Sequence, residues 1–198
     1  MKKIISIILV AIMLFSFAAC GEKTNENTPT GAPVNKEELE KGWKQGVLTF
    51  VNGKTISLPC TIDEIVKTSE FSIPSLQTMA NTFVEPDSEK SLLLVGPDIN
   101  ISIKCKNKTD EPIKVAETTV VGYTVNRTKE GNSKIKFANT LTVNASRVDV
   151  EEVLGVDENA EKNGFSKYAG RNNKNQKVEM RVSYDSNNLV NSVAFEIK

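Results

Sequence analysis

Residues 55–64, TISLPCTIDE, align without a gap with residues 140–149, TLTVNASRVD. In each copy, alternating apolar and polar residues predict a strand. The Ser/Thr-x-x-acid pattern that follows predicts a helix start, because the hydroxyl and the acid can each accept a backbone N–H at the helix terminus. Residues 101–105 and 180–184 then match as alternating strands, each followed by a polar turn and another apolar strand. The sequence therefore predicts a tandem repeat of strand, helix and antiparallel strands.

Two turn sequences favour antiparallel pairing in this repeat. Asn52-Gly53 lies between two apolar runs, and both residue types tolerate positive φ. Residues 185–188, DSNN, separate runs 178–184 and 190–197, in which apolar residues alternate with polar ones. One face of that hairpin is expected to be buried and the other solvated.

The predicted fold class is α+β, with helices packed on one face of an antiparallel sheet. The first repeat is expected over residues 46–130 and the second over residues 131–198. Residues 20–45 are expected to provide a flexible polar tether and a short helix, because residues 22–34, EKTNENTPTGAPV, carry too little apolar surface to offset their ordering entropy.

The short helix is predicted from its capping residues. Asn35 and Glu38 have the spacing of a capping box, and Leu39 and Trp43 lie four residues apart on one helix face. Trp43 is interpreted as a packing anchor, and a ligand-facing aromatic is the alternative.

The N-terminus resembles that of a bacterial lipoprotein precursor. Two lysines precede an uncharged run over residues 4–17, and small residues lead from this run to Cys20. The run is shorter than the roughly 18 residues of a spanning helix. The resemblance implies a signal peptide over residues 1–19, lipid such as palmitate on Cys20, and an extracytoplasmic protein anchored to the bacterial cell membrane through that lipid. Phe17 replaces the usual Leu, and an ordinary secretory signal containing a cysteine is the alternative.

Charge and composition exclude several classes of function. The chain has 25 basic and 25 acidic side chains and no histidine. Removing residues 1–19 would take away two lysines and leave 23 basic against 25 acidic side chains. This balance lacks the excess of basic side chains that nucleic-acid binding requires. The absence of histidine excludes Ser-His-Asp catalysis, Cys-His catalysis and the usual zinc sites. We expect no catalytic residues, no metal, no cofactor and no nucleic-acid partner.

With Cys20 assigned to lipid, Cys60 and Cys105 remain as an even pair outside the cytoplasm. Both lie in phase with apolar neighbours, so both thiols are expected in the same core. We predict a disulfide, which would close a loop of about 45 residues and stabilise the fold by roughly 3–4 kcal/mol. Two buried free thiols are the alternative.

The remaining charged motifs are assigned structural roles. Residues 157–164 begin like a calcium loop, but Lys162 stands where the turn needs glycine and Tyr168 where a bidentate glutamate belongs. The acids at residues 63–64 and 149–152 could form acid/base pairs, yet they lie at predicted helix starts, where negative charge is favoured. The basic, Asn-rich runs 106–108 and 171–177 are interpreted as solvated loops rather than as a site for an anionic glycan or wall polymer.

Residues 146–155, SRVDVEEVLG, and 182–197, VSYDSNNLVNSVAFEI, resemble the helix-plus-hairpin unit of the β-lactamase inhibitor protein family and of the small outer-membrane assembly lipoproteins. The inhibitor family has two tandem copies and grips an enzyme through a concave sheet and a protruding loop, although no inhibitory loop maps onto this sequence. The resemblance implies a non-catalytic binding module for a protein or a cell-envelope polymer, acting through its sheet face or the loop at 157–177. The alternative is an envelope enzyme such as a carboxylate-based glycan hydrolase, which needs two acids converging at about 5–9.5 Å.

Overall fold

The computed structural model describes residues 31–79, 81–96, 99–128 and 132–198. The predicted signal peptide, residues 1–19, and the predicted lipid site Cys20 lie outside these ranges. An antiparallel sheet with the strand order β10-β11-β12-β8-β6-β5 forms the centre of the molecule, and the short β3 pairs with β8. The α+β class and the antiparallel pairing are confirmed.

The central sheet comprises β3 (Cys60–Thr61), β5 (Glu89–Gly96), β6 (Ile99–Lys106), β8 (Thr119–Asn126), β10 (Ser166–Arg171), β11 (Lys177–Tyr184) and β12 (Val190–Ile197). Two small sheets have the orders β2 (Thr55–Ile56), β1 (Leu48–Thr49), β9 (Lys136–Phe137) and β4 (Phe83–Val84), β7 (Ile113–Lys114). The helices are α2 (Lys36–Gly42), α3 (Ile62–Ser69), α4 (Pro74–Met79), α5 (Arg147–Leu154) and α6 (Ala160–Asn163), with single 3-10 turns η1 (Trp43–Gln45), η2 (Val115–Glu117) and η3 (Asn132–Lys134).

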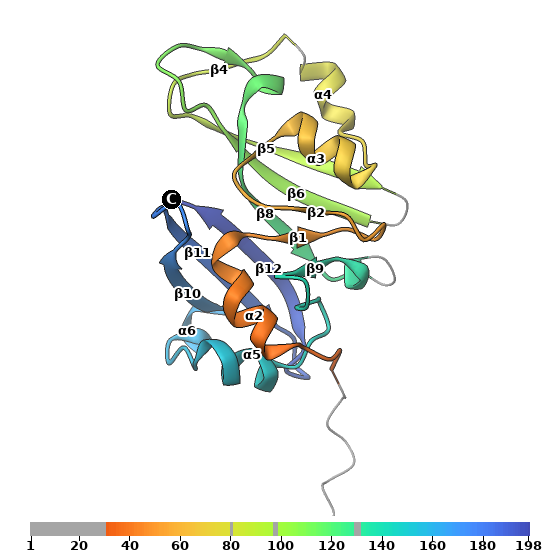
Figure 1. Ribbon diagram of the computed structural model, residues 1–198, viewed down its shortest axis with the longest axis vertical. Helices are drawn as coiled ribbons and strands as arrows, with labels where there is room; N and C mark the ends of the chain where they lie inside the picture. Colours follow the sequence, from red (N-terminus) through yellow and green to blue (C-terminus); the bar gives the residue numbers. More distant parts are fainter. Residues whose placement is uncertain (1–30, 80, 97–98, 129–131) are drawn as a thin grey trace, which may run out of the picture.

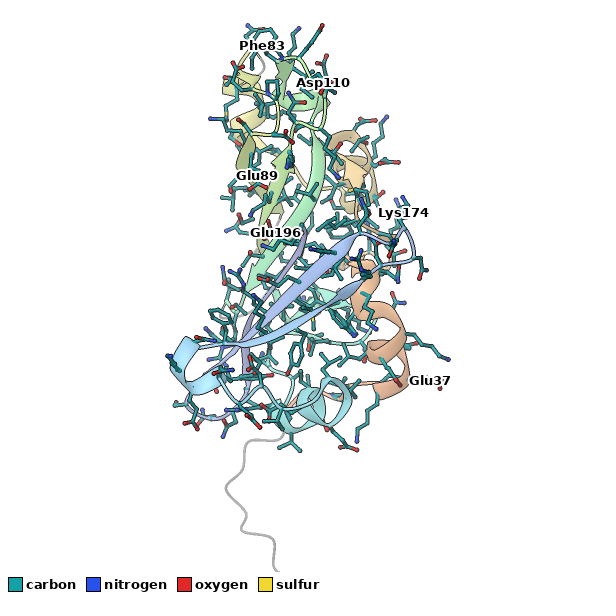
Figure 2. The ribbon with its side chains drawn as sticks, turned by 90° about the vertical axis from the view of Figure 1, so that its left-hand side faces the viewer. Glu37, Phe83, Glu89, Asp110, Lys174 and Glu196 are labelled. Atoms are coloured by element: carbon teal, nitrogen blue, oxygen red, sulfur yellow. The ribbon has the colours of Figure 1, made fainter. Side chains whose placement is uncertain are left out.

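The core lies between one face of the central sheet and the elements in front of it in Figure 1, which include α2, α3 and the β2-β1-β9 sheet. Alternate residues of each strand point into this core, as the pleat of a strand requires. The fully or almost fully buried strand residues include Leu92, Leu94, Ile101, Ile103, Val120, Val125, Met180, Val182, Val193 and Phe195. The opposite face carries polar and charged side chains, and in Figure 2 Glu89 and Glu196 lie on the side away from α2 and α3.

The predicted helix starts are confirmed, although their caps differ. At α3 the full capping box forms: Thr61 Oγ1 accepts the Glu64 N–H at 3.1 Å, and Glu64 Oε2 accepts the Thr61 N–H at 2.7 Å. At α5, Ser146 Oγ accepts the N–H of Val148 at 3.2 Å, one residue earlier than the box requires. At α2, Asn35 Oδ1 accepts the Glu38 N–H at 3.2 Å.

The strand predicted over residues 140–145 is wrong. These residues form turns and isolated bridges instead, because Asn139 and Asn144 have φ of 63° and 78°, which an extended strand does not accommodate. The matching segment 55–60 holds only β2 and the first residue of β3. The alternation of apolar and polar residues nonetheless predicted correctly which side chains are buried. Three alternate side chains of the second copy are inaccessible to solvent: Leu141, Val143 and Ala145.

Both predicted hairpins are confirmed. Gly53 has a φ of 78° in the loop that joins β1 and β2, where the Phe50 N–H donates to the Lys54 carbonyl at 2.9 Å. In the β11–β12 turn, Asp185 Oδ1 accepts the N–H groups of Asn187 and Leu189 at 2.8 and 2.9 Å. These side-chain bonds to the backbone stabilise the turn that the DSNN sequence predicts.

The two predicted regions share their sheets. Strands β5, β6 and β8 come from residues 46–130, strands β10, β11 and β12 come from residues 131–198, and the two sets meet where β8 pairs with β12. The small sheet also joins both regions, because β1 pairs with β9. One continuous core therefore spans both halves of the chain.

Candidate functional site on the open face of the sheet

Cys60 and Cys105 are both free and buried, so the structure has the second alternative rather than the predicted disulfide. The strand register explains this, because both cysteines lie opposite Val120 of β8, one on β3 and the other on β6. Two strand spacings separate their backbones by about 9–10 Å, whereas a disulfide needs Cα atoms within about 7 Å. Burial, with the nearby Glu64 carboxylate, raises the pKa of the Cys60 thiol to about 12, and burial raises the pKa of the Cys105 thiol to about 11. Both thiols are therefore protonated near neutral pH and poor nucleophiles.

The acids at the helix starts have structural partners. Asp63 pairs with Lys67 at 2.6 Å, Glu151 pairs with Arg147 at 2.7 Å, and Glu152 pairs with Lys36 at 2.5 Å. Asp149 lies in the first turn of α5, where its negative charge interacts favourably with the positive end of the helix dipole. Asp63, Glu151 and Glu152 therefore each have a cationic partner of their own.

The segment that begins like a calcium loop is folded around Asp157. Its carboxylate accepts the backbone N–H of Asn159 at 3.0 Å and that of Lys167 at 2.8 Å. Those two hydrogen bonds lower the pKa of the Asp157 carboxyl. Within the ranges that the structure describes, no group of three or more His, Cys, Asp or Glu side chains is arranged to hold a metal ion.

Trp43 packs against the body and presents little of its ring to solvent. The residue is 9% exposed, its ring centroid lies 6.5 Å from that of Tyr168 in an edge-on arrangement, and Lys44 Nζ lies 5.5 Å from the ring centroid. Trp43 also lines a pocket with residues of the segment predicted as the 157–177 loop, which in the structure contains α6 and β10. Because neighbours occupy the ring, Trp43 acts as the packing anchor that the sequence favoured.

The open face of the central sheet carries a network of charged side chains. We define it by the outward side chains of its strands that form one connected network of ion pairs: Glu89, Lys104, Lys167, Glu179, Arg181, Glu196 and the neighbouring Lys198. These residues lie on every strand of the sheet order except β8, and Lys198 directly follows β12. Alternation places them opposite the core, so the same pleat that buries the apolar residues builds this surface.

Ion pairs run continuously across the open face. Lys104 Nζ lies 3.3 Å from Glu89 Oε2 and 2.8 Å from Glu196 Oε1, so it joins β5 to β12. Lys198 Nζ then lies 2.5 Å from Glu196 Oε2 and 3.9 Å from Glu179 Oε1.

At the other end of the network, Glu179 is held by two cations from β10 and β11. Lys167 Nζ lies 2.9 Å from Glu179 Oε2, and Arg181 Nη2 lies 2.5 Å from Glu179 Oε1. The Glu179 side chain is only 11% exposed, so water screens these pairs less than an ordinary surface pair.

These cations set the charge of the two glutamates. Partial burial acts to raise the pKa of Glu179, but hydrogen bonds from Lys167 and Arg181 outweigh it and hold the pKa below its usual value. Burial is likewise outweighed at Glu196, whose pKa is lowered by Lys104 and Lys198. The bond to Glu196 in turn raises the pKa of Lys104. Both carboxylates are ionised at neutral pH.

Glu179 and Glu196 are the two acids to compare with the carboxylate pair of a glycan hydrolase. They lie directly opposite each other on β11 and β12 and line the same hollow of about 150 Å³. Such an enzyme also needs one carboxylic acid with a raised pKa to protonate the leaving group. Here the neighbouring cations lower both pKa values.

Sequence reasoning did not find these residues. Glu179, Arg181 and Glu196 each occupy an outward position of a predicted strand, which is the only signal they carry. Their association depends on the order in which the strands pair, and pattern alone does not give that order.

Searches of protein-family models, of curated proteins and of solved structures found no match to this chain. Over the ranges that the structure describes, no helix is both long enough and apolar enough to cross a membrane.

Proposed function

We propose that this chain is a membrane-anchored extracytoplasmic lipoprotein and acts as a non-catalytic binding module for a protein or a cell-envelope polymer. The observation that carries the binding role is the open face of the central sheet, which lies on the side away from α2 and α3 and is hollowed around Glu179, Arg181 and Glu196 (Figure 2). Its charges are fixed in position by one another. A preformed array of this kind favours a partner with complementary charges, because little side-chain entropy remains to be lost on binding.

The strand order supports the proposed tandem repeat over residues 46–130 and 131–198. In each half, helices precede three antiparallel strands, and the last strands of the two halves, β8 and β12, pair with each other. This arrangement also fits the resemblance to the two-copy inhibitor proteins, whose sheet face is the binding surface.

The membrane anchor rests on the N-terminal sequence. The Lys-Lys start, the uncharged run over residues 4–17 and Cys20 support lipid attachment to this cysteine. Cells that produce the chain should incorporate an alkyne-labelled palmitate into it, and Cys20→Ser should remove the label. Retention of the label in Cys20→Ser would refute the assignment of the lipid to this residue.

Site-specific photocrosslinking tests the binding role of the open face. A photoreactive amino acid at Ala194, which lines the hollow, should give a discrete adduct in intact cells. The control position is Val148 on α5, which is 69% exposed and outside the open face. An adduct that forms equally at both positions, or none at Ala194, would contradict binding through this face.

The enzyme alternative has its own test. A carboxylate-based hydrolase would lose its activity on envelope glycans in both Glu179→Gln and Glu196→Gln. We expect the unmodified chain to release no reducing sugar from isolated cell wall, and measurable release that depends on both residues would replace the binding role with a catalytic one.

A further inference from the structure

The two basic runs that the sequence places 60 residues apart belong to the same end of the central sheet. Strand β6 ends at Lys106, and β10 and β11 are joined by the turn that holds Lys174. Because each neighbouring pair in the order β10-β11-β12-β8-β6 is antiparallel, the end of β6, the end of β12 and the β10–β11 turn lie on one side. A hydrogen bond shows that the end of β12 lies beside the start of β11, because the Lys198 N–H donates to the Lys177 carbonyl at 2.9 Å.

Buried asparagines fix both turns. Asn107, which is fully buried, donates through Nδ2 to the carbonyls of Val84 and Glu111 at 2.8 and 2.7 Å. In the other turn, Asn172 Oδ1 accepts the Lys174 N–H at 3.0 Å and the Gln176 N–H at 2.9 Å. The backbones that carry the lysines are therefore held in place, while the Lys108 and Lys174 side chains are exposed.

The cations at this end lack the carboxylate partners that the open face supplies. In the described part of the chain, no carboxylate lies within 4.0 Å of Lys108 or Lys174, and Lys106 reaches only Asp87 at 3.4 Å. That carboxylate is itself 90% exposed, so the pair is weakened by solvent. Asp110 and Glu111 lie on the same loop but form no ion pair with these lysines.

All three lysines lie at the same end of the central sheet. Partial burial, then the positive charges of Lys106 and Lys174, lower the pKa of the Lys108 ammonium. A protein with nearly balanced charge thus places three like charges at one end of its sheet, one at the end of β6 and two on fixed turns. Such a concentration of one sign favours the binding of an ion of the opposite sign.

We propose that Lys106, Lys108 and Lys174 form a binding site for a phosphate-bearing anionic polymer. Lysine ammoniums act as point charges rather than as planar forks, so they suit phosphates that are repeated along a chain more than one carboxylate or phosphate held at two points. Contributions from two separate turns also require a ligand that extends over both. The proposal is independent of the open face and extends the function beyond it.

Polyphosphate of defined length is the probe, and calorimetric titration of the full chain in detergent is the measurement. Neutralising three phosphates predicts a salt slope of about 2, so affinity should fall roughly 10- to 20-fold between 50 and 200 mM salt. Lys108→Gln and Lys174→Gln should each weaken binding several-fold and reduce the slope by about 0.7. The double variant should bind no detectable polyphosphate, and Lys108→Arg should retain binding.

The matched control is Lys54→Gln, which also removes a surface lysine but from a separate ion pair with Glu70 at 3.1 Å. Equal weakening in Lys54→Gln, or full binding in the double variant, would overturn the site. Ala194→Gln, which alters the hollow of the open face without changing its charge, should leave polyphosphate binding unchanged, so this experiment and the crosslinking test of the open face fail separately.

Competition identifies the source of the phosphate. Phosphatidylglycerol vesicles, inorganic phosphate and single-stranded DNA of matched charge should each compete poorly with polyphosphate. Displacement by vesicles would mean that the site binds lipid headgroups, displacement by micromolar phosphate would mean a single-anion site, and tighter binding of DNA would mean a nucleic-acid surface. Displacement by vesicles or by phosphate would refute the polymer assignment, and tighter binding of DNA would refute a polymer of the cell envelope as the ligand.

Discussion

Gly46 connects the N-terminal segment to the centre of the core, and its replacement by alanine should be strongly destabilising. The residue ends η1 with φ of 58°, in the left-handed region. A Cβ built there would lie 2.4, 2.8 and 2.9 Å from three ring carbons of Phe195. Phe195 is 2% exposed and stacks on Tyr123 with ring centroids 5.7 Å apart, so the ring has no room to retreat.

The magnitude has two parts. The left-handed backbone costs a non-glycine residue about 1–2 kcal/mol, and overpacking of a core costs about 1–3 kcal/mol. Gly46→Ala should therefore lower the free energy of unfolding by about 2–5 kcal/mol. Gly53 supplies a matched control, because its φ is 78° but a Cβ there would meet no atom within 4 Å. Gly53→Ala should lose only the backbone part, about 1–2 kcal/mol.

Urea denaturation followed by the fluorescence of Trp43, the single tryptophan, measures both variants. If the two losses agree within about 0.5 kcal/mol, the reasoning about Phe195 is refuted. The double variant Gly46→Ala, Phe195→Leu gives a further check. Leucine at position 195 is smaller than phenylalanine and should relieve the clash. The two substitutions together should therefore destabilise the protein by less than the sum of their separate effects.

Three further outcomes follow from the geometry. Glu179→Gln should lower the free energy of unfolding by roughly 1 kcal/mol at pH 7. Because the pKa of Glu179 is lowered in the folded state, this loss should disappear as the pH falls from about 4.3 through the folded-state pKa. Denaturation curves that still differ at pH 2 would contradict the prediction. Native protein should resist iodoacetamide at Cys60 and Cys105 at pH 8, unfolded protein should react at both, and an intact mass lower by two hydrogens would instead show a disulfide. Thr61→Ala should remove the α3 cap at a cost of about 1 kcal/mol, whereas Thr61→Ser should retain most of it; equal losses in thermal melts would show that the hydroxyl does not cap the helix.

Local chemistry made the helix starts and hairpin turns predictable. Thr61 and Ser146 mark α3 and α5 because a hydroxyl one residue before a helix accepts an orphan N–H. The DSNN turn was readable for the same reason, since Asp185 can accept backbone N–H groups within its own turn. The strand predicted over 140–145 failed because alternation records which side chains are buried, and left-handed asparagines can bury alternate residues without an extended backbone.

Long-range pairing set the limit of the sequence argument. Cys60 and Cys105 were rightly expected in one core, but only the register shows that Val120 of β8 lies between them. The open face was hidden for the same reason, because Glu179 and Glu196 become neighbours through pairing between strands and not through spacing along the chain.

The point where the chain enters the body bears on which anions its lysines can meet. The Ala32 N–H donates to the Asn144 carbonyl at 2.8 Å, and a side chain at Gly31 would overlap the Ser146 backbone, so the entering segment is held against the start of α5. Ten residues lie between Cys20 and Gly31, and the eleven steps from one to the other span at most about 40 Å when extended. With lipid on Cys20, the end that carries α5 would be nearest the bilayer, whereas Lys174 lies away from that end (Figure 2). Membrane headgroups would then face the wrong end of the sheet, which favours an envelope polymer over lipid as the ligand of the lysine site.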